Sequence, residues 1–538
     1  MSVDLSHCPL RQAESQNFSC AVAPIPLQWL AIKMDPEPLS RRSFLALTTM
    51  AAAHAALWPA FDQSQEFMYM TLKEASELVR RKAVSPVELT ATCLKSIKAY
   101  NPALNAFITV TGDQAMETAR AMEEEQVRGK WRGPLHGIPI ALKDNIDTAG
   151  VRTTAASELF KDRVPSEDAE VVQKLKNSGA VLLGKTNLHE FALGGTSAVS
   201  YFGPVRNPWA LDRIPGGSSG GSGAATAAGL CFGSLGTDTA GSVRIPASYC
   251  GIVGFRPTYG RVSSRGTVPD SWTLDQIGPL CRSVEDTALM LRAIAGYDEL
   301  DPTSVDVPVP DFGLAFQMRP SKLRVGVPRV PFFDALDPEV EKATARAIEV
   351  VTRLAGEVRD LASPIVAAPL PEIWTKVAGA ESYTYHSKWL AESPEKYQPA
   401  TRRRLASPTN AGVQGMSSAE MKASTYVEAR RQLDVLRREI RKVFASVDLL
   451  VLPTLLSPPV TVEQGADPTI VSIRNTAPFS VLGLPALSLP CGFTTAGLPI
   501  GLEIVGAPFA ESTVLALAHA YERETVWHKN HPRLSPPA

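Results

Sequence analysis

Hydrophobic and polar positions alternate in blocks along most of the chain. Between Leu135 and Asp238 three short apolar runs, GIPIALKDN, AVLLGKTN and CFGSLGTD, are each followed by residues that favour a loop or a helix. Similar runs return later as KLRVGVP, VDLLVLPTLL and LPALSLPCG. Continuous apolar runs of this length are typical of buried strands, and their alternation with helical segments predicts an α/β fold with a largely covered sheet.

Capping signals predict two helices near the start of this region. Thr71 with Glu74, and Ser85 with Glu88, have capping-box spacing, and Pro86 stands at the first helical position of the second helix. We expect that helix to end at Asn101-Pro102, and we expect further helices at residues 114–126, 166–178, 222–229, 338–358 and 418–446. No internal repeat or low-complexity linker interrupts the pattern, so residues 61–538 are predicted to form a single domain.

Residues 1–60 are predicted to be an N-terminal extension. Arg41-Arg42 precedes Ser43-Phe44-Leu45 and a moderately apolar run that ends near Trp58, and A-x-A options such as Ala53-His54-Ala55 could serve for cleavage. This order resembles a twin-arginine export signal, which would make the protein periplasmic. The alternative is a chance arginine pair in the leader of a cytoplasmic protein. The long stretch before the arginine pair favours Met34 as the true start, and the apolar run is too short for a membrane span of about 20 residues.

Composition narrows the classes of function. The 538-residue chain is 44% hydrophobic and 20% charged, which is ordinary for a soluble enzyme. A net charge of −1 gives no electrostatic reason to expect nucleic acid or an acidic membrane as a partner. The seven cysteines form no CxxC pair and no cluster with histidine, which argues against a zinc site or a disulfide framework.

The stretch PGGSSGGSG, residues 215–223, allows several interpretations. A linker is disfavoured because residues 222–229 continue as a small-residue helix, and a phosphate-binding loop would need a lysine or a preceding strand that are missing. Ser218 and Ser219 both satisfy the G-x-S-x-G pattern of a hydrolase nucleophile elbow. However, no strand precedes them, and the histidines that could serve as base, His519, His528 and His531, have no distinctive setting.

Residues 216–247, GGSSGGSGAATAAGLCFGSLGTDTAGSVRIPA, together with Lys143 in GIPIALKDNID, resemble the signature motif of the amidase signature family. The resemblance extends over most of residues 67–525. It implies a central mixed β-sheet covered by helices on both faces. It also implies a catalytic triad in which Ser242 is the nucleophile, Ser218 bridges from a cis peptide and Lys143 is the base, with no metal or organic cofactor.

Physical chemistry is consistent with these roles. A serine hydroxyl is a weak nucleophile unless a base removes its proton, and lysine is a base only when neutral. To lower a lysine pKa from about 10.4 to about 7–8, the charged form must be destabilised relative to the neutral form by roughly 4 kcal/mol. Burial on the apolar IPIAL strand can supply this destabilisation. Asp144 follows Lys143, but neighbouring side chains of a strand point to opposite faces, so we expect Asp144 to be structural.

The resemblance also implies an oxyanion hole made by backbone N–H groups at Thr239, Ala240, Gly241 and Ser242. Ala240 stands where many family members have glycine, which would narrow the pocket slightly. We interpret Asp238 and Arg244 as an internal ion pair that steadies this loop, and we expect Ser219 to hydrogen-bond within the same network. His136 and His189 are interpreted as loop or core residues.

The resemblance is compatible with two functions. The first is an exported amidohydrolase that cleaves a carboxamide, anilide, carbamate or ester of a small molecule. The second is the glutaminase component of a tRNA-dependent amidotransferase, an assembly that works inside the cell, because VRNPWALDRIPGGSSGGS and PTYGRVSSRG are close to the sequence of that component. A non-catalytic binding protein is disfavoured because the triad is intact, and the sequence leaves open whether the chain forms a homodimer. The substrate is expected to be selected by residues 372–390, 272–276 and 400–425, whose aromatic residues favour an apolar group.

Overall fold

The computed structural model describes residues 67–362, 370–406, 418–467 and 469–534. These residues belong to one compact unit, Asp62–Ala538. The predicted extension of residues 1–60, with its twin-arginine pattern and Met34, lies outside the described residues.

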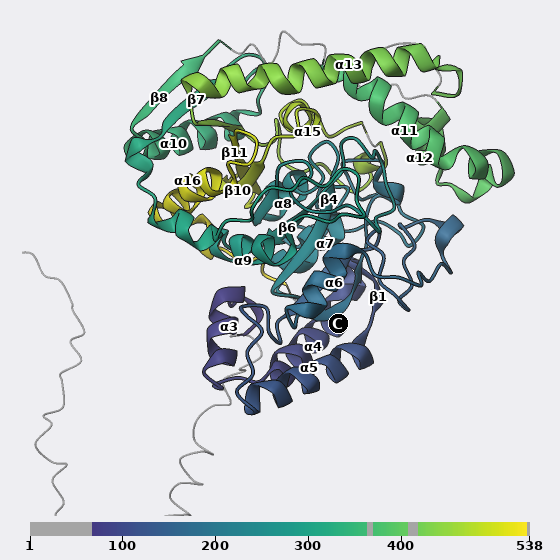
Figure 1. Cartoon of the computed structure of the whole chain (residues 1–538), viewed down its shortest axis with the longest axis vertical. Helices are drawn as coiled ribbons and strands as arrows, with labels where there is room; N and C mark the ends of the chain where they lie inside the picture. The colour runs from purple at the N-terminus through teal and green to yellow at the C-terminus, as the bar shows by residue number, and fades with distance from the viewer. Residues whose placement is uncertain (1–66, 363–369, 407–417, 468, 535–538) are drawn as a thin grey trace, which may run out of the picture. The chain divides into compact units, whose positions relative to one another are not determined.

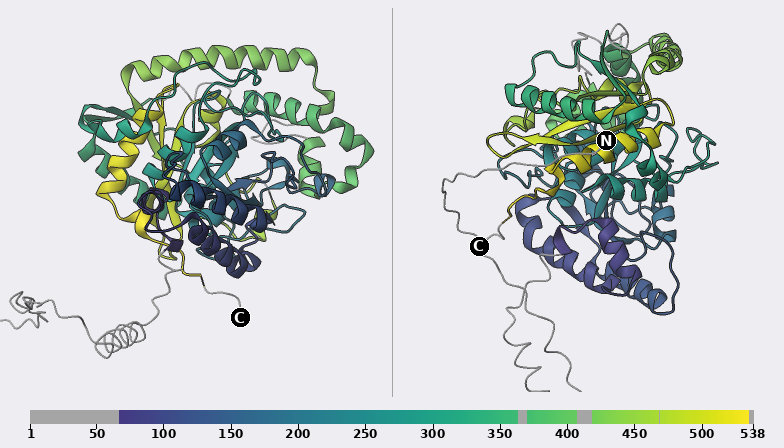
Figure 2. Two further views of the ribbon diagram at one scale, coloured as in Figure 1. Left: turned by 60° about the horizontal axis from the view of Figure 1, so that its bottom comes forward. Right: turned by 90° about the vertical axis from the view of Figure 1, so that its left-hand side faces the viewer.

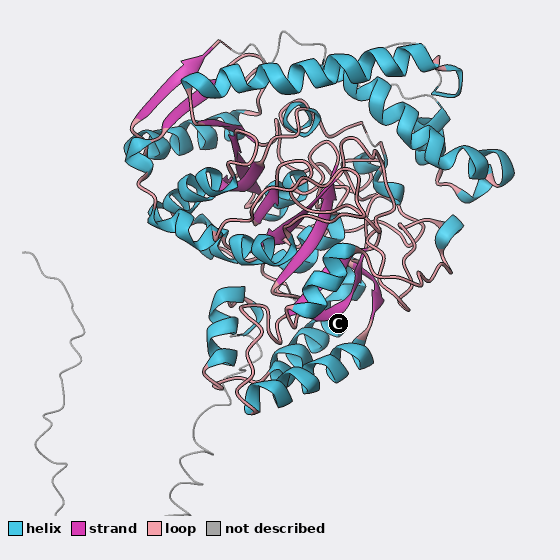
Figure 3. Cartoon of the chain, in the orientation of Figure 1, coloured by secondary structure: helices cyan, strands magenta, loops and turns pink. Residues whose placement is uncertain are grey.

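The described residues contain one sheet of eleven strands, which confirms the predicted α/β class (Figure 3). The spatial order is β1-β3-β2-β4-β6-β5-β10-β11-β9-β7-β8. Strand β2 is parallel to β3 and β4, strand β7 is parallel to β8 and β9, and the remaining pairs are antiparallel. The strands are β1 Phe107–Val110, β2 Pro139–Lys143, β3 Val181–Thr186, β4 Gly233–Asp238, β5 Val253–Arg256, β6 Gln276–Cys281, β7 Arg324–Pro328, β8 Glu357–Leu361, β9 Leu449–Pro453, β10 Ala486–Phe493 and β11 Pro499–Gly506.

Helices surround this sheet (Figures 1 and 2). They are α3 Leu72–Arg80, α4 Pro86–Leu104, α5 Gly112–Val127, α6 Glu170–Asn177, α7 Gly220–Ala227, α8 Arg244–Cys250, α9 Val284–Ile294, α10 Pro338–Leu354, α11 Leu370–Glu392, α12 Pro399–Ala406, α13 Ala423–Glu439, α14 Val443–Ser446, α15 Ala477–Val481 and α16 Glu511–Glu524. None of these described helices has the length and apolarity needed to cross a membrane.

The two helix starts predicted from capping signals are accurate, whereas several other predicted bounds are not: the helix expected over 338–358 ends at Leu354, because Glu357–Leu361 form strand β8. Both capping boxes are present at Thr71 and Ser85. Helix α4 does not stop at Asn101 as expected, but continues through Pro102 to Leu104 and ends at Asn105 in a left-handed conformation. Proline is tolerated there because it lies in the last turn, which the Asn105 N–H closes onto the Asn101 carbonyl at 2.7 Å. The segment predicted as one helix over 418–446 is divided into α13, a short 3₁₀ turn at Ile440–Lys442, and α14.

Alternate residues of β10 face different layers of helices. Leu487 and Leu489 belong to the large core cluster that also contains Leu515 of α16. Ser488 points the other way, toward α8, because a Cβ built at its neighbour Gly501 would lie 2.5 Å from Ser248 Oγ of α8 and 2.9 Å from Ser488 Oγ. The sheet is therefore covered on both faces, as the resemblance implied.

Candidate active site

Lys143 ends strand β2 in a fully buried position. Its Nζ lies 2.7 Å from Ser218 Oγ and 2.7 Å from Thr237 Oγ1. Burial lowers the pKa of Lys143 to about 7, although the carboxylates of Asp275, Asp238 and Asp270 act to raise it. A large fraction of this lysine is therefore neutral near pH 7 and can accept a proton, which agrees with the shift expected from the sequence.

Ser218 precedes helix α7 and is joined to Gly217 by a cis peptide bond, as the resemblance implied. The Ser218 carbonyl accepts hydrogen bonds from the His189 N–H and from Ser197 Oγ, both at 3.1 Å. A side chain at Gly217 would place Cβ 2.8 Å from the backbone nitrogens of Thr196 and Ser197. The glycine is therefore required by the close approach of the 196–197 backbone, which holds Ser218 in position.

Ser242 lies in the loop between β4 and α8 and lines a cavity of about 530 Å³. Its carbonyl accepts a hydrogen bond from the Ser219 N–H at 3.3 Å, so the backbones of the two serine segments are in contact. No hydrogen bond joins Ser218 Oγ to Ser242 Oγ among the described residues. Hydrogen bonds of a catalytic relay are often long in a substrate-free enzyme and tighten in the complex.

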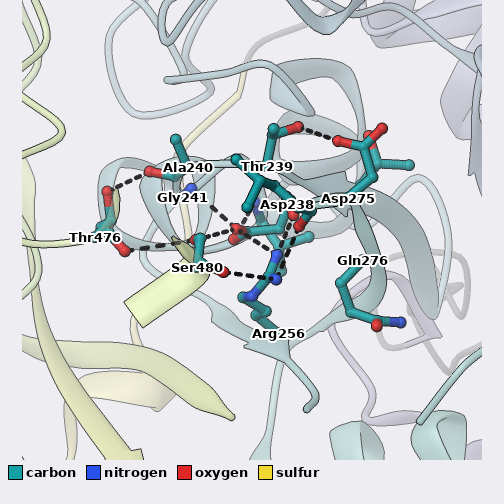
Figure 4. Close-up of polar contacts among 12 residues, drawn as sticks. Asp238, Thr239, Ala240, Gly241, Arg256, Asp275, Gln276, Thr476 and Ser480 are labelled. Atoms are coloured by element: carbon teal, nitrogen blue, oxygen red, sulfur yellow. Dashed lines mark hydrogen bonds and ion pairs between the residues drawn. The ribbon is translucent and has the colours of Figure 1, made fainter. Parts of the chain in front are cut away.

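The loop expected to form the oxyanion hole is organised by Asp238 (Figure 4). Asp238 Oδ1 accepts the Gly241 N–H at 2.9 Å, and Oδ2 accepts the Val243 N–H at 3.2 Å. Because Gly241 already donates to this carboxylate, its N–H is not free for an oxyanion. The N–H groups of Thr239, Ala240 and Ser242 donate to no group in the described part of the chain, and all three residues line the cavity.

The ion pair predicted between Asp238 and Arg244 is present and is part of a larger buried network. Arg244 contacts both carboxylate oxygens of Asp238, at 3.1 and 3.0 Å, and also pairs with Glu503 of β11. Arg256 of β5 is a second cation on Asp238. Burial alone would raise the pKa of Asp238, but the charges of the two arginines hold it below its usual value. The carboxylate therefore stays ionised and keeps its hydrogen bonds to the loop.

Segments from the C-terminal part of the chain complete this network. Thr476 Oγ1 donates to the Ala240 carbonyl at 2.6 Å, and Ser480 Oγ donates to Asp238 Oδ1 at 3.0 Å (Figure 4). Thr239 Oγ1 donates to Asp275 Oδ1 at 2.5 Å on the other side of the loop. Each end of the 239–241 loop is thus fixed by a side chain that is distant in sequence.

Asp144 and Ser219 support the site indirectly. Asp144 Oδ2 accepts the Thr154 N–H at 2.9 Å and contacts the Thr154 hydroxyl, and burial raises its pKa to about 6. It makes no hydrogen bond with Lys143 among the described residues, which supports the expected structural role. Ser219 Oγ donates to the Thr237 carbonyl at 3.2 Å and thereby reaches the residue that holds Lys143.

The sequence interpretation missed Thr237 as a partner of Lys143. Thr237 stands directly before Asp238 in the signature motif. Its hydroxyl also accepts a hydrogen bond from Asn145 Nδ2 at 3.2 Å. The parallel pairing of β2 with β4 brings these residues together, and that pairing is not visible from spacing alone. The sequence interpretation did not single out Arg256, Ser480 or Glu503, because their contacts with Asp238 and Arg244 join segments that are far apart along the chain.

The expected substrate-selecting segments contribute unequally to the cavity. Trp374 of α11 and Arg404 of α12 line it, whereas Trp389 packs in a separate cluster with Phe160 and Tyr397. No residue of the 272–276 loop lines the cavity, and residues 407–417 lie outside the described chain. No histidine of the described residues lines the cavity. The nucleophile-elbow hypothesis, which needs a histidine base beside the serine, is therefore not supported.

His136 and His189 are buried, as expected. His136 Nε2 lies 3.0 Å from the Met122 carbonyl, and His189 Nδ1 lies 3.2 Å from Thr196 Oγ1. Among the described residues no group of histidine, cysteine and acidic side chains is arranged to hold a metal ion.

Comparisons with known proteins relate this arrangement to one family. The family model described as "Amidase" matches residues 88–515. A curated relative from Moorella thermoacetica, the A component of its glutamyl-tRNA(Gln) amidotransferase, is 43% identical over 492 residues, which cover 87% of this chain and 99% of the relative. A solved structure described as "Crystal structure of amidase" is 35% identical with a TM-score of 0.72, and the match covers 85% of this chain and all of that one. The structure of a 6-aminohexanoate cyclic dimer hydrolase is 29% identical with a TM-score of 0.78, covering 87% of this chain and 99% of the other.

Proposed function

Because this chain belongs to the amidase signature family, we propose that it cleaves a carboxamide C–N bond through an acyl-enzyme formed on Ser242. The observation that carries this proposal is the contact of 2.7 Å between the buried Lys143 Nζ and Ser218 Oγ beside the cavity that Ser242 lines. Lys143 with a pKa of about 7 is suited to accept a proton at neutral pH.

In this mechanism Ser242 Oγ attacks the amide carbonyl while its proton passes to Ser218, which gives its own proton to Lys143. The proton then moves to the leaving amine, and a water molecule hydrolyses the acyl-enzyme through the same relay in reverse. The N–H groups of Thr239, Ala240 and Ser242 are the proposed oxyanion donors, because the Gly241 N–H is held by Asp238. Loss of one such donor typically lowers kcat by about 10²–10³-fold.

The names of the curated relatives favour the alternative physiological role, the glutaminase component of a tRNA-dependent amidotransferase. The Moorella thermoacetica relative carries the name of such a component and is matched over 99% of its length. In this role the amide would be that of glutamine, and the ammonia would be used by a partner protein.

A hydrolase of a small-molecule amide, acting without a partner, is supported by the walls of the cavity. Apolar side chains of Phe332, Leu370, Trp374 and Val481 form much of its lining. Such walls suit a substrate with an apolar group better than they suit the short polar side chain of glutamine.

The two roles differ in a measurable way. We expect the isolated protein to release ammonia from a panel of primary carboxamides if it is a hydrolase. It should release ammonia from glutamine only with its partner proteins and charged tRNA if it is the amidotransferase component. In either case Ser242→Ala should abolish turnover while circular dichroism and thermal unfolding stay unchanged, because the side chain is small and lines the cavity. Full activity of Ser242→Ala would refute the mechanism.

Location follows from the same choice. The hydrolase role is compatible with export through the pattern at Arg41-Arg42, whereas the amidotransferase role, which the relatives' names favour, requires the cytoplasmic alternative. A fusion of residues 1–66 to a reporter, compared with the same fusion carrying Arg41→Lys and Arg42→Lys together, tests this directly. Periplasmic reporter that depends on the arginine pair supports export, and reporter that stays in the cytoplasm in both fusions refutes it.

A further inference from the structure

Asn145 is a buried polar residue close to Lys143 that the proposed mechanism does not use. Its side chain is 1% exposed, and Nδ2 lies 3.2 Å from the Val268 carbonyl oxygen and 3.2 Å from Thr237 Oγ1. A carbonyl oxygen can only accept a hydrogen bond, so the part of the amide that faces it is the NH₂ group. Asn145 therefore donates to both oxygens, and the direction of its hydrogen bond to Thr237 is fixed.

The hydroxyl proton of Thr237 has one remaining acceptor. A threonine hydroxyl carries a single proton, and in the described part of the chain Thr237 Oγ1 has two hydrogen-bonding neighbours, Asn145 Nδ2 and Lys143 Nζ. Because Asn145 donates to this oxygen, Thr237 can give its proton only to Lys143. Neutral Lys143 has a lone pair on Nζ, 2.7 Å from Thr237 Oγ1, that accepts this proton, whereas a charged lysine has none.

The charged form of Lys143 therefore leaves a buried hydroxyl proton without an acceptor. The penalty for such a group corresponds to roughly one pH unit or more in a pKa. The carboxylates of Asp275, Asp238 and Asp270 all act in the other direction and favour the charged lysine. His189 is uncharged near pH 7, because burial lowers its pKa to about 3. The hydrogen bonds of Asn145 thus act together with burial and against the three carboxylates.

We propose that Asn145 is a positioning residue that, by donating to Thr237, keeps Lys143 in its neutral form. In the resting protein this leaves Lys143 able to take the proton that Ser218 gives up, and the Thr237 hydroxyl then turns from donor to acceptor of Nζ. Once protonated, Lys143 is a stronger acid than it would be without Asn145, so it returns the proton to the leaving amine more readily. This inference rests on the proposed role of Lys143 as the base.

A direct titration of Lys143 tests the proposal without any substrate. The full-length protein is labelled with ¹³C in its lysine side chains, and the Cε signal that disappears in Lys143→Met is assigned to Lys143. The chemical shift of this signal follows protonation of the amine as the pH changes. Its midpoint is then compared between the wild-type protein and variants of Asn145.

Asn145→Ala is the decisive variant. A water molecule in the vacated space can donate to the Val268 carbonyl and accept the Thr237 proton, so a charged Lys143 no longer leaves that proton unpaired. We expect the midpoint to move to higher pH by about one unit. A midpoint that stays in place or moves to lower pH would overturn the proposal.

The effect of Asn145 must pass through the Thr237 hydroxyl. In the Thr237→Val background that hydroxyl is absent, so adding Asn145→Ala should leave the midpoint where Thr237→Val alone places it. In the Thr237→Ser background, which keeps a hydroxyl, Asn145→Ala should again move the midpoint by about one unit. Equal shifts in the two backgrounds would show that Asn145 acts through packing alone, and the hydrogen-bond chain would be refuted.

Asn207→Ala is the matched control for loss of a buried amide. Asn207 is fully buried, and its Nδ2 also bridges two acceptors, the carbonyls of Ile214 and Tyr249 at 3.1 and 2.9 Å. These hydrogen bonds do not involve the partners of Lys143. We therefore expect Asn207→Ala to lower the stability of the protein and to leave the Lys143 midpoint unchanged; a shift like that of Asn145→Ala would count against the proposal.

Asn145→Asp serves if Asn145→Ala does not fold. It keeps the shape of the side chain and places an acceptor oxygen beside Thr237 Oγ1 in place of the donor. Its charge raises the Lys143 midpoint in every background, so the informative quantity is the difference between the shifts in the Thr237→Ser and Thr237→Val backgrounds. We expect a difference of about one pH unit, and a difference of zero would refute the chain.

Turnover separates this inference from the proposed reaction. With the most active primary carboxamide of the panel as the probe, the lower limb of the profile of kcat against pH should move up by about one unit in Asn145→Ala, with KM constant. Activity well below the limb should fall about tenfold and recover at high pH. A displaced Lys143 midpoint in a protein that releases no ammonia would support the inference and refute only the hydrolase role. A limb that moves while the Cε midpoint does not would overturn the inference.

Discussion

Replacing Lys143 with methionine is expected to abolish activity and yet to stabilise the protein near neutral pH. In the folded state the pKa of Lys143 is lowered from 10.5 to about 7, so charging the buried amine costs about 5 kcal/mol more than in the unfolded chain. At pH 7 the lysine is protonated in the unfolded chain, so folding must either bury the charge or release the proton. Both lower the free energy of unfolding. Methionine removes that cost but also removes the contacts with Ser218 and Thr237, worth about 1 kcal/mol each. The expected net gain is about 2 kcal/mol.

The gain should depend on pH with a defined sign. Between pH 7 and 10.5 the unfolded chain binds a proton that folded Lys143 does not, so the stability of the wild-type protein rises with pH through this window. The variant has no such term. Its advantage should therefore shrink as the pH rises, and the wild-type protein should be the more stable one near pH 10.

Equilibrium urea unfolding followed by tryptophan fluorescence in a series of buffers measures this difference. Lys185→Met is the matched comparison, because Lys185 is the second fully buried lysine and burial lowers its pKa to about 8. The stability difference between this variant and wild type should change with pH in the same sense, but from about pH 8 instead of pH 7, because the folded pKa is higher. A stability difference between Lys143→Met and wild type that does not change with pH would show that folded Lys143 is charged, and the reasoning for its role as base would fail.

Three further predictions concern the surroundings of the triad. Asp238→Asn leaves two buried arginines without their shared carboxylate and should lower the free energy of unfolding by about 3–5 kcal/mol, measured by urea unfolding; a loss below about 1 kcal/mol would contradict the network. Gly217→Ala should abolish folding or activity because its Cβ would lie 2.8 Å from backbone nitrogens, whereas Gly112→Ala, with only ordinary contacts at 3.8 Å, should be neutral or stabilising; equal behaviour of the two variants refutes the close approach. Thr237→Val should lower kcat by about tenfold and shift the lower limb of the pH–rate profile, while KM stays constant, since it removes a partner of Lys143 without touching the cavity; an unchanged pH profile would show that the hydroxyl does not position the amine.

The sequence predicts well those features that depend on neighbours along the chain. The capping boxes at Thr71 and Ser85 and the buried strand that carries Lys143 are local properties, and the structure confirms them. In the signature motif Ser218 and Ser242 each follow a glycine, Gly217 and Gly241, and the structure shows that a Cβ at either glycine would be too close to neighbouring atoms.

Features that depend on the order of strands are not predictable in this way. Thr237 meets Lys143 because β2 and β4 are adjacent and parallel, although 94 residues separate the two. The use of the Gly241 N–H by Asp238 is equally invisible in the motif, since only the folded loop reveals which donors remain free. The end of α4 was mispredicted for a simpler reason: proline in a last turn costs little when the following residues close that turn.

The contacts between the segment around residues 238–244 and residues Thr476–Glu503 have a consequence for co-translational folding. Lys143, Ser218 and Ser242 are all synthesised before Thr476, which contacts Ala240 of that loop, and before Ser480 and Glu503, which contact the Asp238–Arg244 pair that organises it. A nascent or truncated chain that ends before Thr476 therefore contains every residue of the proposed triad but lacks part of the contacts that fix the loop of the proposed nucleophile. Hydrolytic competence should thus arise only when translation is nearly complete, so fragments released early would carry the motif without the chemistry.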